Sequence, residues 1–132
     1  MEYPGNLFYT KDHEWISFDD QYALIGITDF AQNELGDIVY VEISTLNSTI
    51  LKEGIFGTVE AVKTVSDLFM PVTGKIVAVN QDIENKPELV NLDPYSTWLI
   101  KVFVSTAIEK ESLLTAEAYK SLIGANTALN AH

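Results

Sequence analysis

The chain has 132 residues, a length typical of a single domain with a substantial hydrophobic core. Eight Lys and Arg residues against 19 Asp and Glu residues give a net charge of −11, which argues against binding to nucleic acid or to an anionic membrane. There is no cysteine, which excludes disulfides, zinc–thiolate sites, iron–sulfur clusters and cysteine nucleophiles.

The first half of the chain predicts short strands broken by turn residues. Residues 22–27 form a compact strand candidate after a turn at Asp19 and Asp20. Thr28 or Asp29 is positioned to cap a short helix over residues 30–35, with Gly36 closing it in the left-handed conformation. Residues 38–43 are β-branched and aromatic with little alternation of polarity. We therefore expect that segment to be a largely buried strand.

Further along the chain, residues 56–62, 74–79 and 98–104 have the composition of strands, and residues 82–85 that of a helical turn. A final helix is predicted to begin after Thr115 as N-cap and to end at Gly124. We expect one domain over residues 1–124 and a flexible tail over residues 125–132.

No motif for a metalloprotease, a serine hydrolase, a phosphate-binding loop or a dinucleotide fold is present. His13 has no evident nucleophile beside it, so we interpret it as a surface or half-buried residue and not as a general base. No metal site is predicted. The notable basic residue is Lys63, which lies among apolar residues at the predicted tip of a hairpin between Val62 and Ser66. Without further information, a solvated turn lysine is the simple interpretation.

The identity of the neighbouring residues changes that interpretation. Residues from Leu7 to Gly124 contain, in order, a series of blocks that resemble the glycine cleavage system H-protein family. The matching blocks are Tyr9–Trp15, Gly26–Gln32, Leu35–Val41, Phe56–Phe69, Pro71–Gly74, Pro87–Asn91, Asp93–Tyr95, Trp98–Lys101 and Leu113–Tyr119. Agreement of several motifs in order is a stronger signal than any single motif. The resemblance implies a mostly β fold, a barrel-sandwich hybrid with short peripheral helices and one helix at the C-terminal end.

The resemblance also implies a carrier and not an enzyme. Lys63 is then the residue amidated by lipoate, and the modified chain has a net charge of −12. The lipoyl arm carries an aminomethyl group from glycine decarboxylase, a pyridoxal-phosphate enzyme, to a tetrahydrofolate-dependent aminomethyltransferase. Dihydrolipoyl dehydrogenase reoxidises it, and a lipoate ligase or lipoyltransferase attaches it. We expect a monomer, because a carrier has to visit several active sites.

By the same resemblance, Glu14, Ser66 and Asp67 are candidates for a cleft that holds the loaded arm, and Glu60 is a candidate for recognition during lipoylation. Two alternatives stay open here. Ser66 and Asp67 are also a typical turn pair, and Glu14 is otherwise a charge at the rim of the surface. The loops at residues 44–49 and 95–98 depart from the family pattern.

Several other functions compete with this one. A lipoyl domain of a 2-oxoacid dehydrogenase is shorter and leaves the terminal blocks unexplained, and a biotinyl domain has Met on both sides of its lysine. A lipoate-relay scaffold for other enzymes and an unmodified interaction module remain alternatives. The start of the chain lacks a basic and apolar signal sequence, so the expectation is a bacterial cytoplasmic protein, although a mature mitochondrial protein has the same features.

Overall fold

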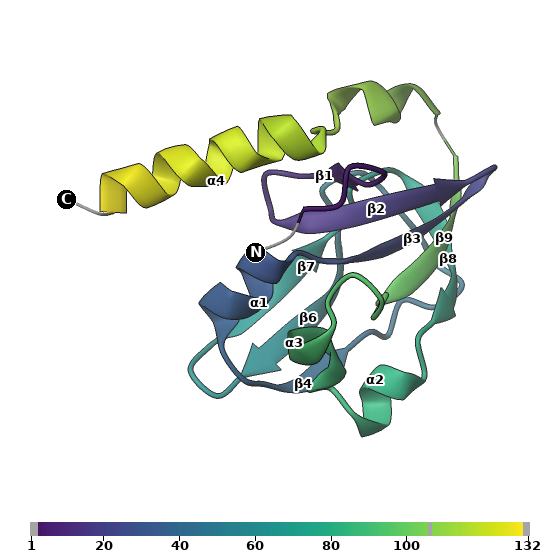
Figure 1. Cartoon of the computed structure of the whole chain (residues 1–132). Coiled ribbons are helices and arrows are strands. Elements are labelled where there is room, and N and C mark those ends of the chain that lie inside the picture. The colour runs from purple at the N-terminus through teal and green to yellow at the C-terminus, as the bar shows by residue number, and fades with distance from the viewer. Residues whose placement is uncertain (1–2, 106, 131–132) are drawn as a thin grey trace.

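The computed structural model describes residues 3–105 and 107–130. Within them the chain forms two antiparallel sheets that pack face to face, with helices at the periphery (Figure 1). The strands are β1 (Phe8–Tyr9), β2 (Glu14–Asp19), β3 (Tyr22–Ile27), β4 (Ile38–Glu42), β5 (Thr49–Ile50), β6 (Ile55–Ala61), β7 (Val65–Phe69), β8 (Gly74–Val79) and β9 (Ile100–Val104). The helices are α1 (Asp29–Leu35), α2 (Asp82–Asn85), α3 (Leu89–Leu92), a 3₁₀ segment (Ala107–Ser112) and α4 (Ala116–Asn130). The predicted barrel-sandwich hybrid is confirmed.

The larger sheet has the order β1-β2-β3-β9-β8-β5, and the smaller sheet has the order β4-β6-β7. Strand β9 therefore lies between β3 and β8, in the middle of the larger sheet. The predicted strands 22–27 and 74–79 are confirmed at both ends. The turn before β3 is also confirmed, with Asp20 in the left-handed region at φ 57°.

The main core lies between the two sheets, where alternate side chains of both sheets point inward. Its largest fully buried members include Ile16, Ile25, Phe56, Ile76 and Ile100. Burial of apolar side chains stabilises the fold by roughly 2 kcal/mol for each one removed completely from water. The interior is therefore rigid, and the edges and hairpins of the sandwich are the parts free to present functional groups.

A second apolar cluster joins the N-terminal strand to the C-terminal helix. Tyr9 stacks on Tyr119 with ring centroids 4.9 Å apart, and Trp15 packs in the same cluster. Tyr9 also exchanges two backbone hydrogen bonds of 2.8 Å with Leu114. Helix α4 consequently lies against β1 and extends beyond the sandwich (Figure 1).

The short helix α1 begins at one of the two predicted caps and ends before Gly36 as predicted. Gly36 has the positive φ that favours glycine, but its ψ of −156° lies outside the left-handed helical conformation that was expected. The Thr28 side chain accepts a hydrogen bond of 3.1 Å from the Ala31 amide, so Thr28 and not Asp29 is the N-cap. Gly36 follows the helix with φ 78° and donates its amide to the Gln32 carbonyl. The predicted helical turn over residues 82–85 is likewise present as α2.

Apart from one-residue differences in the bounds of β4 and β6, three further predictions of local structure are wrong. Strand β4 is not largely buried, because a register shift between Ile38 and Tyr40 leaves Val39 and Tyr40 about half exposed, at 49% and 50%. Strand β9 begins at Ile100, two residues later than predicted. Helix α4 does not end at Gly124 but continues to Asn130. The flexibility expected of residues 125–132 is untested, and residues 131–132 lie outside the described residues.

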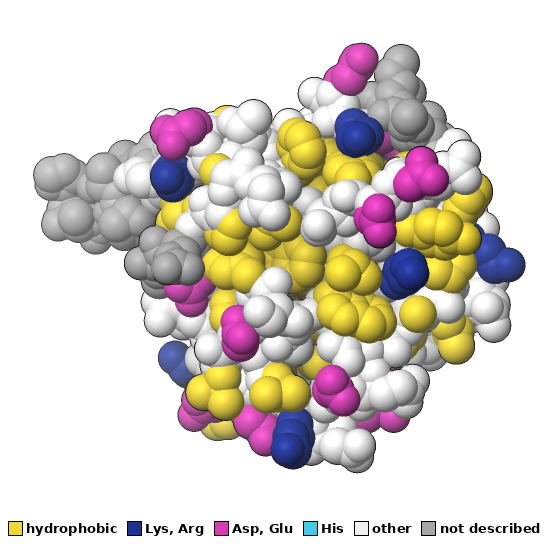
Figure 2. Space-filling view, turned by 45° about the vertical axis from the view of Figure 1, so that its right-hand side comes forward, with side chains coloured by type: hydrophobic (Ala, Val, Ile, Leu, Met, Phe, Trp, Pro, Cys, Tyr) yellow, Lys and Arg dark blue, Asp and Glu magenta, His cyan; other side chains and the backbone are white. Residues whose placement is uncertain are grey.

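The face of the molecule that lies on the right-hand side of Figure 1 carries both charged and hydrophobic side chains. Figure 2 shows acidic and lysine side chains scattered among hydrophobic ones on that face, with no single charged field. Among residues 3–105 and 107–130, no helix has both the length and the hydropathy needed to cross a membrane.

Candidate functional site at the β6–β7 hairpin

Lys63 lies at the tip of the hairpin formed by β6 and β7, as predicted. The Ala61 amide donates a 2.8 Å hydrogen bond to the Thr64 carbonyl, which closes the tip around Val62 and Lys63. Both tip residues are exposed, whereas Val59 and Leu68 anchor the strands below in the core. A flexible cationic side chain is thus carried on a rigid support, the arrangement that a group moving between partners needs.

The stem of Lys63 passes over Gly36 in the turn between α1 and β4. A Cβ atom added to Gly36 would lie only 3.2 Å from the Lys63 Cε and 3.7 Å from its Nζ. Gly36 has φ 78°, a conformation that favours glycine for a second, independent reason. The absence of a side chain at this position therefore leaves room for the lysine stem.

The outer face of the smaller sheet is acidic beside the lysine. Glu60 is exposed and lies opposite Tyr40 on one side and Val65 on the other. Asp67 is exposed on β7, opposite Thr58. Because Ser66 and Asp67 lie within a strand, the alternative that they form a turn pair is wrong.

Glu14 is a buried group, so the alternative of a rim charge is wrong. Its side chain is only 2% exposed, and one carboxyl oxygen accepts a 2.7 Å hydrogen bond from the Phe69 amide. The other accepts a longer bond of 3.3 Å from the Thr10 hydroxyl. Burial raises the pKa of Glu14 to about 8, although the hydrogen bond from Phe69 acts in the opposite direction. Glu14 is accordingly protonated through most of the neutral range.

The structure brings the three predicted cleft residues together. Glu14, Ser66 and Asp67 line one pocket of about 190 Å³ between α1 and β7. Lys63 and Glu60 do not line it, although Lys63 leaves the hairpin beside it, above Gly36. The pocket lining also contains Asp12 and Glu34, which the sequence reasoning missed.

A signal for one of these missed acids was present in the sequence. Glu34 immediately precedes Leu35, another lining residue, and both lie on the last turn of α1, directly before Gly36. Because the turn that follows α1 lies against the hairpin tip, the last residues of α1 are close to the hairpin.

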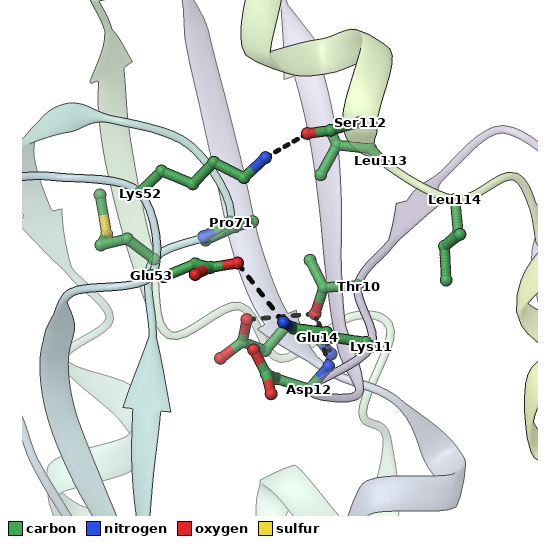
Figure 3. A pocket seen from close by; sticks show the side chains of 11 residues that line it. Thr10, Lys11, Asp12, Glu14, Lys52, Glu53, Pro71, Ser112, Leu113 and Leu114 are labelled. Carbon is green, nitrogen blue, oxygen red and sulfur yellow. Dashed lines mark hydrogen bonds and ion pairs between the residues drawn. The ribbon is translucent and has the colours of Figure 1, made fainter.

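Glu14 also lines a second pocket, of about 290 Å³. Figure 3 shows the carboxyl group of Glu14 near Thr10, with the Lys11–Glu53 ion pair close by. Lys52 reaches across this pocket and donates a hydrogen bond to Ser112. The buried carboxyl group of Glu14 therefore forms part of the lining of two pockets.

The half-buried side chain of His13 packs between α1 and α4. Its backbone is in the left-handed region at φ 66°, and its Nδ1 is hydrogen-bonded to the Tyr119 hydroxyl at 2.9 Å. Its ring also packs against Phe30 at 4.8 Å between centroids. Burial lowers the pKa of His13, more than the nearby carboxylates raise it. Although His13 lines the smaller pocket, its ring contacts residues of α1 and α4.

A lysine presented on a hairpin tip, above a two-sheet sandwich, defines the class of swinging-arm carrier domains. The family model described as "Glycine cleavage H-protein" matches residues 7–126, which is most of the chain. The chain belongs to this family, whose members are the lipoyl-carrying shuttles of the glycine cleavage system. It is therefore a carrier component of that system.

Relatives support the assignment over more than nine-tenths of the chain. The glycine cleavage system H protein of Chlorobium chlorochromatii is 57% identical over 125 residues, covering 94% of this chain and 99% of the relative. That of Bacillus cereus is 51% identical over 123 residues, covering 92% and 97%. A crystal structure of an H protein from Mycobacterium marinum superposes with a TM-score of 0.82 at 37% identity, covering 92% of this chain and 99% of the other.

Proposed function

We propose that Lys63 is the lipoylation site of this chain and that the lipoyl arm carries the aminomethyl group. The supporting observation is that Lys63 occupies the exposed hairpin tip with its stem over Gly36. The exposed position of the residue gives a lipoylating enzyme access to its amine. When bound, lipoate supplies the sulfur chemistry that the chain lacks, since the sequence contains no cysteine.

We further propose that the pocket of about 190 Å³ holds the loaded arm. A carried aminomethyl group has a basic amine, and Asp67 offers a carboxylate at the pocket lining while Ser66 offers a hydroxyl. Glu14 adds a buried carboxyl that accepts hydrogen bonds when ionised and donates one when protonated. The chain itself would bind and shield the arm and perform no catalytic step.

The partners proposed for the chain follow from membership of the glycine cleavage system. They are glycine decarboxylase, the tetrahydrofolate-dependent aminomethyltransferase, dihydrolipoyl dehydrogenase and a lipoate ligase or lipoyltransferase. We propose that Glu60, exposed on the strand that leads to Lys63, is read by the lipoylating enzyme. We propose a monomer in the bacterial cytoplasm, because a carrier has to bind several enzymes in turn. The relatives described above are bacterial.

The deciding experiment is coexpression with a lipoate ligase, followed by intact mass and peptide mapping. We expect a single lipoyl amide on Lys63, which Lys63→Arg abolishes. Lys75→Arg is the matched control, because Lys75 is also exposed but lies on β8 in the other sheet. An unmodified wild-type chain, under conditions that modify a control lipoyl domain, would overturn the proposal. So would lipoylation that persists in Lys63→Arg.

A further inference from the structure

Asn91 of α3 makes three hydrogen bonds to one short stretch of chain. Its side-chain amide donates to the Gly36 carbonyl at 2.8 Å and to the Gln32 side-chain oxygen at 3.0 Å. Its side-chain oxygen accepts from the Ile38 amide at 2.9 Å. The donor and the acceptor of one side chain thus hold both ends of the turn formed by residues 36–38.

This turn is also the support of the hairpin tip. The Asp37 carbonyl accepts a 3.0 Å hydrogen bond from the Val62 amide, one residue before the lysine. Gly36 lies directly under the lysine stem. The tip therefore has two contacts with the turn, a hydrogen bond to its backbone and the packing of Lys63 on it. In Figure 1 the hairpin tip and the connection between α1 and β4 lie at the same lower edge of the molecule.

We propose that Asn91 is a positioning residue for the arm on Lys63. It acts through the 36–38 turn, which it holds in the one conformation that supports Val62 and seats the lysine stem. Residues Glu34 and Leu35, directly before the turn, line the pocket proposed for the arm, so the turn directs the stem along the side of that pocket. The part of this inference that concerns the arm rests on the proposed lipoylation of Lys63; the clamp on the hairpin does not.

The chain offers a matched control for the test. Asn80 also donates its amide to a backbone carbonyl, that of Trp98 at 2.8 Å, and accepts a backbone amide, that of Asp82 at 3.0 Å. Asn91→Asp and Asn80→Asp make the same chemical change. Each retains an acceptor, removes an amide donor, and places an oxygen opposite a carbonyl. Of these two asparagines, only Asn91 is hydrogen-bonded to the turn of residues 36–38.

The first measurement uses the unlipoylated protein and follows hydrogen exchange of the Val62 amide by NMR. We expect Asn91→Asp to speed this exchange at least about tenfold relative to wild type, corresponding to about 1.4 kcal/mol. We expect Asn80→Asp to change it less than about twofold. Equal exchange of Val62 in the two variants would overturn the clamp, whether or not Lys63 is ever lipoylated.

The second measurement is kcat/KM of a lipoate ligase acting on each variant. We expect Asn91→Asp to lower it at least threefold through KM, because the tip has to be ordered in the enzyme, while Asn80→Asp leaves it unchanged. Unchanged lipoylation of Asn91→Asp, with faster exchange at Val62, would overturn the role in positioning the arm. No lipoylation of the wild type would instead count against the proposed function.

If Asn91→Asp does not fold, the wild-type protein still provides a test. In native-state hydrogen exchange with increasing urea, the Val62 and Ile38 amides should exchange through one opening below global unfolding, with one urea dependence. Separate openings of the two amides would overturn the inference.

Discussion

The imidazole Nδ1 of His13 lies 2.9 Å from the hydroxyl of Tyr119, a residue 106 positions later in the chain. The same hydroxyl lies 2.8 Å from the Thr28 hydroxyl, at the N-cap of α1. One buried phenol group therefore connects the turn before β2, the start of α1 and helix α4. Removal of the Tyr119 hydroxyl would leave both His13 Nδ1 and the Thr28 hydroxyl without this hydrogen-bond partner.

We expect Tyr119→Phe to lower the free energy of unfolding by about 1–2 kcal/mol, since it deletes the shared hydrogen-bonding group and keeps the ring. Urea unfolding measures this change directly. Tyr22→Phe is the control, because Tyr22 is 41% exposed, and it should change stability by less than about 0.5 kcal/mol. Equal effects of the two variants would contradict the role assigned to the Tyr119 hydroxyl.

The buried carboxyl of Glu14 predicts a pH dependence of stability. Its pKa is about 8 in the folded protein against an ordinary value of 4.5, so between these pH values the folded state keeps a proton that the unfolded state has released. The free energy of unfolding then falls as pH rises through this window, with a slope approaching about 1.4 kcal/mol per pH unit.

Glu14→Gln removes this titration and nearly preserves the shape of the side chain. Urea unfolding at pH 5, 6.5 and 8 should show the wild type losing stability relative to the variant as pH rises. A difference between the two proteins that stays constant across the series would contradict the buried, protonated state of Glu14.

The indole of Trp15 lies against Gly26, so that a Cβ at Gly26 would be 2.5 Å from its Cε2. The indole cannot easily move, because its Nε1 donates a 2.9 Å hydrogen bond to the Pro94 carbonyl. We expect Gly26→Ala to destabilise the fold by about 2 kcal/mol, as overpacking does. Thermal unfolding monitored by tryptophan fluorescence checks this.

Gly124 provides the contrasting substitution. It lies within α4, and nothing would come within 4 Å of its added Cβ. Gly124→Ala should therefore stabilise the protein or leave it unchanged, by up to about 1 kcal/mol from helix propensity. If both alanine variants behaved alike, the packing described at Trp15 would be incorrect.

A comparison of substitutions at Glu60 and Glu42 distinguishes specific recognition of Glu60 by the lipoylating enzyme from a general effect of negative surface charge. Both are exposed on neighbouring strands of the smaller sheet, but Glu60 lies three residues before Lys63. We expect Glu60→Gln to lower the rate of lipoylation about tenfold, the effect of one lost charge-assisted hydrogen bond, and Glu42→Gln to have little effect. Ligase assays at one ionic strength compare them, and equal rates would remove Glu60 from the recognition site.

Asp67 tests the pocket proposed for the arm. Asp67→Asn keeps the shape of the side chain and removes its charge, so protein loaded with the aminomethyl group should release ammonia to water faster, by about threefold for an exposed charge. Asp19→Asn changes a carboxylate in the other sheet and should leave the release rate unchanged. A release rate that does not respond to Asp67→Asn would argue against this role.

Local features of the fold could be predicted from the sequence because local interactions produce them. Thr28 caps α1 and Gly36 ends it through contacts within one helical turn. The tip of the lysine hairpin was expected between Val62 and Ser66, directly after the strand-like segment 56–62, and the structure has it there, although strand β7 was not predicted. The strand over residues 22–27 has the same local origin, and its bounds were predicted without error.

The errors arose where distant parts of the chain decide the outcome. Glu14 is buried where its carboxyl oxygen accepts a hydrogen bond from the Phe69 amide, 55 residues away, and nothing beside Glu14 in the sequence indicates this. The exposure of Val39 and Tyr40 results from a register shift against β6. Gly124 does not end α4, because an exposed glycine in a helix is only a modest cost and is not a stop.

The position of β9 has a consequence for biosynthesis. All strands of the sheet that carries Lys63 come from residues 38–69, so a growing chain holds every partner of the hairpin soon after its middle has been synthesised. The larger sheet cannot be completed as early, because its central strand β9 is synthesised last among its strands. Until residue 104 has left the ribosome, β1, β2 and β3 have no neighbour to join them to β8 and β5, and the hydrophobic faces on both sides of that gap stay open to the chaperones of the cell.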